Sequence, residues 1–143
     1  MFPFLLVVYG WFECLALVLL VLALLGIPWI SSRVALIATL QCIGVGVLRS
    51  LPLAFEAHAV LGVILLALLV AWVFRVPAGR SLVAGVGAMA LLVAVEFGVI
   101  AAVHPFFDPA MNPFIWLLTG LPQVFVLVTL AFAARKRGIV LFR

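Results

Sequence analysis

The sequence predicts an all-α integral membrane protein, a bundle of five transmembrane helices joined by short loops. Hydrophobic residues make up 70% of the 143 residues and charged residues only 8%, whereas soluble domains carry about 25% charged residues. A soluble domain of this size has too much surface for its volume to bury so many apolar side chains. The charged residues also fall mainly between long apolar runs, as they do in the loops of membrane proteins.

Crossing the hydrocarbon of a bilayer takes about 20 residues of helix, and apolar runs of similar length divide this chain. The first run has no basic segment before it and is too long for a secretory signal peptide, so it is expected to remain as a span. The predicted helices cover about residues 2–25, 34–49, 57–74, 81–103 and 114–134.

Each predicted helix ends where the apolar pattern is broken. Gly26 and Pro28 in "GIPWISSR" end the first helix, and Arg49 and Pro52 in "LRSLP" end the second. The third helix is followed by "RVPAGR", and the fourth by "HPFFDPAMNP", which contains three prolines. The fifth is followed by "RKRGIVLFR", so residues 135–143 are predicted to form a basic cytoplasmic tail.

The distribution of basic residues predicts the orientation of the bundle. With the N-terminus outside, the inner segments hold seven of the eight lysines and arginines, and the outer segments hold only Arg49. Basic residues concentrate in cytoplasmic loops. The chain is therefore predicted to be a multi-pass protein of the cell membrane, with its C-terminus in the cytoplasm. The net charge of +4 is explained by these topology signals, and the partner it indicates is the lipid bilayer rather than nucleic acid.

Several polar side chains fall inside the predicted spans, where an ionisable group costs about 2.5–3.5 kcal/mol. Glu13 lies near the middle of the first helix, about 16 Å below its outer end at 1.5 Å per residue, and Tyr9 is one turn earlier on the same face. Gln123 lies at a similar depth on the fifth helix, beside Pro122. We expect Tyr9, Glu13 and Gln123 to line a polar pocket that binds a ligand or a proton.

Arg49 and Glu96 are predicted to form an ion pair within the membrane. Each lies 15 residues from the cytoplasmic start of its span, counted from Val34 and Ser81, which is about 22 Å along a helix. Equal depth makes pairing favourable, because a charge without a partner is costly there. The alternative is that all these polar groups serve only to hold the helices together and to select their packing partners.

Four further polar residues form a predicted cluster at the outer face: Glu56, His58, His104 and Asp108. Both histidines fall at helix ends rather than inside spans, and no metal-ligand spacing accompanies them. The two cysteines, Cys14 and Cys42, are isolated in apolar runs and show no zinc or disulfide pattern. The sequence therefore predicts neither a cofactor nor a metal site.

The chain resembles a group of mostly uncharacterised five-helix membrane proteins of Clostridia-type bacteria, which are similar to the membrane-embedded N-terminal regions of some sensor histidine kinases. The matching features are Glu13, "LRSLPLAFEAH", Glu96 and the "LPQ" of the fifth helix. The family pattern has Phe-Gly-x-His after Arg-x-Leu-Pro, and Glu56 stands here in place of that glycine. The resemblance implies a sensory or interaction module without a catalytic domain.

An enzyme is not expected, because the sequence contains no arrangement of nucleophile and base and its loops are short. The leading hypothesis is a non-enzymatic membrane module with a buried polar site that senses a signal or binds a partner. The partner would be another membrane protein or further copies of this chain. The alternative is a small proton-coupled or ion-conducting transporter that acts as an oligomer through Glu13 and Glu96.

The orientation is tested with a reporter fused after Arg143. The seven-to-one distribution of basic residues predicts that a cytoplasmic reporter is active at this position. Activity of an exported reporter at the same position would contradict the predicted topology.

Overall fold

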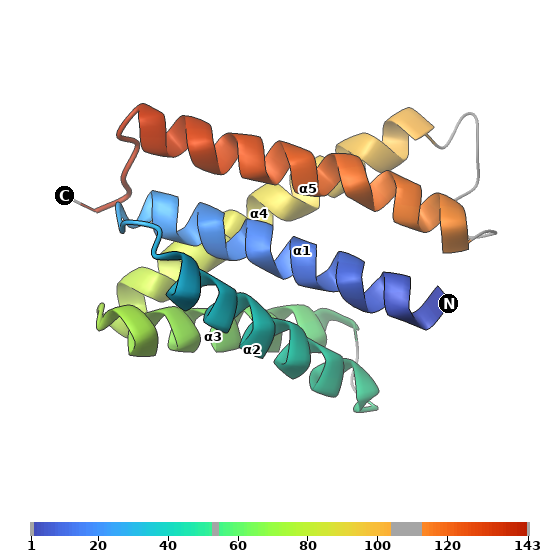
Figure 1. The fold of residues 1–143 in the computed structure, drawn as a ribbon, viewed down its shortest axis with the longest axis horizontal. Helices are drawn as coiled ribbons and strands as arrows, with labels where there is room; N and C mark the ends of the chain where they lie inside the picture. The colour runs from blue at the N-terminus through green and yellow to red at the C-terminus, as the bar shows by residue number, and fades with distance from the viewer. Residues whose placement is uncertain (1, 53–54, 104–112, 143) are drawn as a thin grey trace.

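The computed structural model describes residues 2–52, 55–103 and 113–142, which form α-helices joined by short connections (Figure 1). The helices are α1 (Phe2–Leu24), α2 (Ser31–Ser50), α3 (Phe55–Phe74), α4 (Ala78–Val103) and α5 (Pro113–Lys136). The predicted all-α, five-helix fold is confirmed. By length and composition, α1 to α4 are each able to cross a membrane.

The helices extend further at their polar ends than the hydropathy pattern predicts. α2 begins at Ser31 rather than near residue 34, and α4 begins at Ala78 rather than near residue 81. At the start of α4, the amides of Arg80 and Ser81 both donate hydrogen bonds to the carbonyl of Pro77. Hydropathy locates the edge of the apolar segment, whereas backbone hydrogen bonding continues into the polar first turn.

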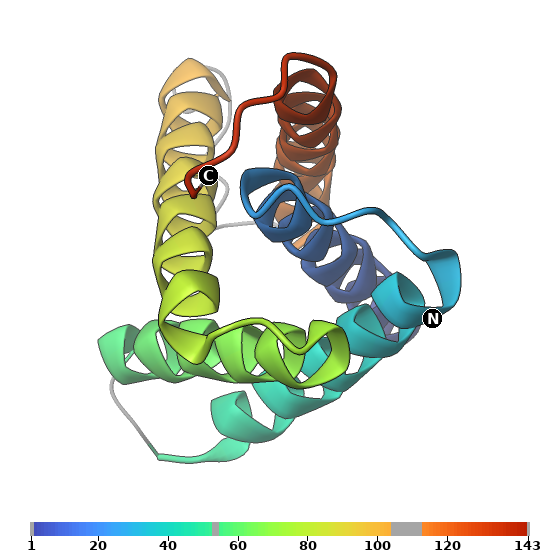
Figure 2. The same ribbon diagram turned by 90° about the vertical axis from the view of Figure 1, so that its left-hand side faces the viewer.

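α1 is the central helix of the bundle and packs against α2, α4 and α5. α3 packs between α2 and α4, so it completes the bundle on the side away from α5 (Figure 2). The start of α1, the end of α2 and the start of α3 lie at one end, called here the N-terminal end. The C-terminal end carries the α1–α2 and α3–α4 connections and the end of α5 (Figure 1).

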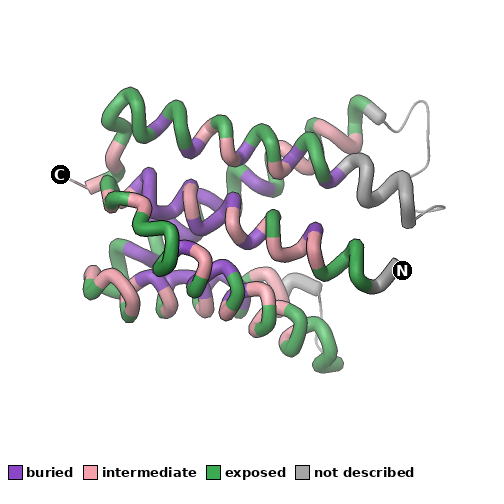
Figure 3. The backbone as a smooth tube through the Cα atoms, viewed as in Figure 1, coloured by how far each residue is buried: buried purple, intermediate pink, exposed green. Residues whose placement is uncertain are grey.

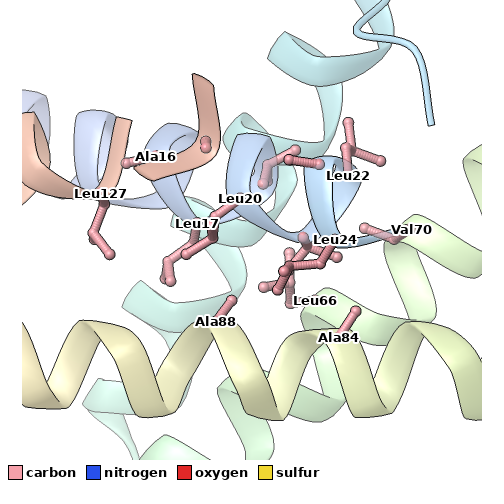
Figure 4. Close-up of a cluster of buried hydrophobic side chains, with 14 of the residues drawn as sticks. Ala16, Leu17, Leu20, Leu22, Leu24, Leu66, Val70, Ala84, Ala88 and Leu127 are labelled. Atoms are coloured by element: carbon pink, nitrogen blue, oxygen red, sulfur yellow. The ribbon is translucent and has the colours of Figure 1, made fainter. Parts of the chain in front are cut away.

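The hydrophobic core lies mainly in the half of the bundle nearer the C-terminal end (Figure 3). From Ala16 to Leu24, α1 is buried at every position except Leu19. A helix that is apolar on all sides is expected to be enclosed by other helices. Figure 4 shows this segment of α1 surrounded by side chains from three other helices, including Leu66 and Val70, Ala84 and Ala88, and Leu127.

The end of α5 folds back onto the end of α1. Gly138 has a positive φ of 63°, and the amide of Ile139 bonds to the carbonyl of Ala134, as in a helix C-cap of the Schellman type. The amide of Leu141 then donates a 2.8 Å hydrogen bond to the carbonyl of Leu24. In its described part, the predicted tail is thus the last turn of α5 followed by a segment packed on the bundle.

Trp29, in the α1–α2 connection, is held against α5 from two sides. Its ring makes an edge-to-face contact with Phe132, with ring centroids 4.7 Å apart. The guanidinium of Arg135 lies 4.5 Å from the centroid of the same ring. These contacts fix the C-terminal end of α5 to the connection that follows α1.

Replacing Arg135 with glutamine is expected to weaken this attachment. The loss of a cation–π contact at an exposed site should lower the free energy of unfolding by about 0.5–1 kcal/mol, measured by thermal or denaturant unfolding in detergent. Arg137→Gln removes the same charge two residues later and is the matched control. Equal effects of the two substitutions would contradict a specific role for the Arg135–Trp29 contact.

Candidate functional site

The predicted intramembrane polar residues gather in the N-terminal half of the bundle, beyond the hydrophobic core. Tyr9 and Gln123 are buried, with 6% and 4% of their surfaces exposed, while Glu13 and Glu96 are half-buried. Arg49 is exposed in the last turn of α2. The residues come from α1, α2, α4 and α5, so the site is built between helices rather than along one.

Tyr9 packs directly against α5. The end of its phenol ring lies on Gly120, at the position that a side chain would otherwise occupy. One turn further along α5 is Gln123, and both belong to a buried stripe of that helix: Gly120, Gln123, Leu127, Ala131 and Ala134. The α1–α5 interface therefore changes from apolar in the core to polar at Tyr9 and Gln123.

Glu13 is the electrostatic centre of the site. It follows Tyr9 by one helical turn and interacts electrostatically with both Arg49 of α2 and Glu96 of α4. Arg49 attracts the Glu13 carboxylate, and Glu96 repels it. Tyr9 lies within electrostatic range of Glu13, Arg49 and Glu96. Tyr9 and Glu13 thus lie within electrostatic range of Arg49 and Glu96, while direct pairing of Arg49 with Glu96 stays a prediction.

The end of α2 brings Arg49 to this site. The hydroxyl of Ser50 donates a 2.7 Å hydrogen bond to the carbonyl of Val47. The amide of Leu51 donates a hydrogen bond to the carbonyl of Leu48. Pro52 follows. A basic residue in the last turn of a helix is favoured by the helix dipole, so the helix end and the Glu13 carboxylate both favour a cation here.

Gln41 is a buried polar residue that the sequence analysis missed. It has 3% of its surface exposed, and its Nε2 donates a 2.9 Å hydrogen bond to the carbonyl of Gly62 on α3. Its Oε1 is buried and accepts no hydrogen bond within the described part of the chain. The sequence signal that could have identified Gln41 is its position in the middle of an apolar helix. A polar side chain there is costly in hydrocarbon, which is the argument that identified Glu13.

Two further contacts join α1 to α2. The Trp11 Nε1 donates a 3.0 Å hydrogen bond to the Thr39 hydroxyl, which itself donates to the carbonyl of Ala35. Cys14 and Cys42, isolated in the sequence, are within hydrogen-bond contact of each other, and both are free thiols.

A groove of about 310 Å³ lies between α1 and α2. Its lining is almost entirely apolar and consists of Val7, Val8, Trp11, Thr39, Cys42 and Ile43.

The predicted outer-face cluster is described only in part. His58, in the first turns of α3, is half-buried, and its buried Nε2 has no hydrogen-bond partner among the described residues. Glu56 belongs to α3, but its side chain lies outside the described part, and His104 and Asp108 lie outside the described residues altogether. Within the described residues, no group of three or more His, Cys, Asp or Glu side chains is arranged to hold a metal ion.

No family model, curated protein or solved structure matches this chain.

The close contact between Tyr9 and Gly120 predicts that Gly120→Ala disturbs the site. The added methyl group would overlap the phenol ring, and overpacking of this kind costs about 1–3 kcal/mol. Thermal unfolding in detergent measures the loss. Gly10→Ala, next to Tyr9, is the control, because nothing described lies within 4 Å of its new methyl group. If Gly120→Ala were as stable as Gly10→Ala, Tyr9 would not be packed on α5.

Proposed function

We propose that the protein is a non-enzymatic sensory module of the cell membrane, in which a signal received at the Glu13 site changes the packing of α1 and α5. The observation that supports this most directly is the connection of Glu13 to charged groups on two other helices. Protonation of Glu13, or binding beside it, changes the forces on α1, α2 and α4 together. The resemblance to the membrane regions of sensor kinases points to the same role.

α1 and α5 provide a physical route from this site to the opposite end of the bundle. Tyr9 packs on Gly120, and two residues later α5 contains Pro122, which cannot donate a backbone hydrogen bond within the helix. Such a position allows a helix to bend. A shift of Tyr9 would therefore move the later part of α5, whose last turn holds Arg135 against Trp29.

The apolar C-terminal half favours sensing over transport. Besides Tyr9, the buried polar residues in the described part of the chain are Gln41, Ser81 and Gln123, and of these only Ser81 lies near the C-terminal end. Otherwise, the core between the site and that end consists of tightly packed apolar side chains. A charged species would find few polar partners along this path, and an ion without partners in hydrocarbon is costly.

With the N-terminal end outside, the site would face the exterior and the basic residues Arg135 to Arg137 would face the cytoplasm. Anionic lipid attracts each basic residue near its surface by about 1 kcal/mol. A partner membrane protein, or another copy of the chain, would respond to movement at this end of α5.

The proposal is tested with Trp29 as a reporter of distant events at Glu13. The variant Trp11→Phe, Trp72→Phe, Trp116→Phe retains Trp29 alone among the four tryptophans. Glu13 precedes Trp29 by 16 residues, so an effect of its titration on Trp29 must be transmitted through the bundle. We expect Trp29 emission to change with pH, and Glu13→Gln to abolish the change. His58→Gln, which removes an imidazole from the same half, should leave it intact.

Transport is tested on the same protein in liposomes. The proposal predicts no proton or ion flux above that of protein-free vesicles. Flux that is abolished by Glu13→Gln would overturn the sensory role in favour of a transporter. A pH response of Trp29 that persists unchanged in Glu13→Gln would overturn the assignment of Glu13 as the receiving group.

A further inference from the structure

The groove between α1 and α2 is bounded on one side by a hydrogen bond that joins the two helices. α1 and α2 are antiparallel (Figure 1), and the Trp11 indole donates to the Thr39 hydroxyl across their interface. Residues before Trp11 on α1 therefore lie opposite residues after Thr39 on α2. The remaining lining residues follow this register and are Val7 and Val8 of α1 and Cys42 and Ile43 of α2. The groove thus extends from the hydrogen bond toward the N-terminal end of the bundle.

Gly46 leaves the same face of α2 open between the groove and the end of the helix. It follows Cys42 by one turn, is exposed, and has no described atom within 4 Å of the position that a Cβ would occupy. Arg49 follows Cys42 by seven residues, which is about two turns, so Cys42, Gly46 and Arg49 share one face. Helical side chains lean toward the N-terminus of their helix. Arg49 therefore leans toward Gly46 and the groove, with no side chain at Gly46 to separate them.

An alkyl chain suits the shape and the lining of this groove. The lining is almost entirely apolar, and Val7 and Ile43 are exposed at the surface of the bundle. Its volume of about 310 Å³ is at the lower end of the range for pockets that hold small molecules, about 300–1,000 Å³. A helix with its side chains is about 10–12 Å across and is too wide to enter it. The hydrocarbon of a bilayer supplies alkyl chains at such a surface.

Arg49 determines which headgroup is favoured at the end of such a chain. It is exposed at the N-terminal end of the bundle, whereas the other described arginines and lysines are near the C-terminal end. A guanidinium forms paired hydrogen bonds with a phosphate, and its several N–H donors can serve a phosphate and the Glu13 carboxylate together. The last carbonyls of α2 repel an anion, so the attraction depends on Arg49. A zwitterionic headgroup is disfavoured because its own cation competes for the phosphate.

We propose that the α1–α2 groove binds an anionic phospholipid of the leaflet at the N-terminal end. One acyl chain lies along the groove, and the phosphate binds Arg49. The lipid then joins α1 to α2 next to the hydrogen bond from Trp11 to Thr39. This inference goes beyond the proposed sensory function, because the ligand is a constituent of the membrane rather than the signal received at Glu13.

Trp11 lines the groove and reports directly on its occupant. The full-length variant Trp29→Phe, Trp72→Phe, Trp116→Phe retains Trp11 alone among the four tryptophans. It is reconstituted in phosphatidylcholine vesicles with increasing fractions of phosphatidylglycerol that is brominated in its acyl chains, because bromine quenches a tryptophan that it contacts. Brominated phosphatidylcholine is the comparison. We expect half-maximal quenching at an about fivefold lower fraction of the anionic lipid, as for one basic residue near an anionic surface.

Four substitutions in this variant separate the effect of charge from that of space. Arg49→Gln should remove the difference between the two lipids, whereas Arg80→Gln, at the opposite end of the bundle, should leave it. Gly46→Leu should block the path between the groove and the guanidinium, and should also remove the difference. Gly98→Leu is its matched control, because Gly98 is likewise an exposed helical glycine with no described atom within 4 Å of an added Cβ. A melting curve in detergent shows whether each variant is folded.

Equal quenching by the two brominated lipids would overturn the inference. A lipid preference that persists in folded Arg49→Gln or Gly46→Leu would also overturn it. If neither lipid quenched Trp11, a second copy of the chain or another protein would cover the groove, and the lipid site would be wrong. Gly46→Leu leaves every charge in place, so it decides the test even if Arg49→Gln does not fold.

Discussion

The burial of polar groups in an apolar bundle is the constraint on which the N-terminal half depends. Hydrocarbon offers no partner to a polar group, so each such group must find one in a neighbouring helix. Glu13 of α1 lies within electrostatic range of Arg49 of α2 and Glu96 of α4. The hydrogen bonds from Trp11 to Thr39 and from Gln41 to Gly62 meet the same requirement between α1 and α2 and between α2 and α3.

The C-terminal half is held together by a different kind of contact. There α1 is enclosed by apolar side chains, and the segment after α5 provides a donor for the Leu24 carbonyl. The core of this half consists of apolar side chains, so its packing depends on burial of apolar surface rather than on charge. The molecule thus combines a group of polar and charged side chains near one end with an apolar core near the other. α1 and α5 run through both.

Hydropathy was sufficient to predict the fold class and the number of helices. It also showed that Glu13 is an ionisable group inside an apolar span, where its burial is costly. It was insufficient for contacts that depend on how each helix is rotated. α1 is apolar on nearly all sides, so nothing in its pattern showed that Cys14 would meet Cys42 or that Tyr9 would lie on Gly120. The basic residues after α5 indicated topology, but the return of Leu141 to Leu24 depends on the helix cap at Gly138.

The central claim is that Glu13 of α1 and Arg49 of α2 interact, and a double-mutant cycle measures this directly. Unfolding free energies of the wild type, Glu13→Gln, Arg49→Leu and the double variant give the coupling, with Glu13 and the distant Arg80 as the control pair. Residues in one charged network typically couple by about 0.5–3 kcal/mol. The account predicts coupling in this range for Glu13 with Arg49 and none with Arg80. Additive effects of Glu13→Gln and Arg49→Leu would contradict it.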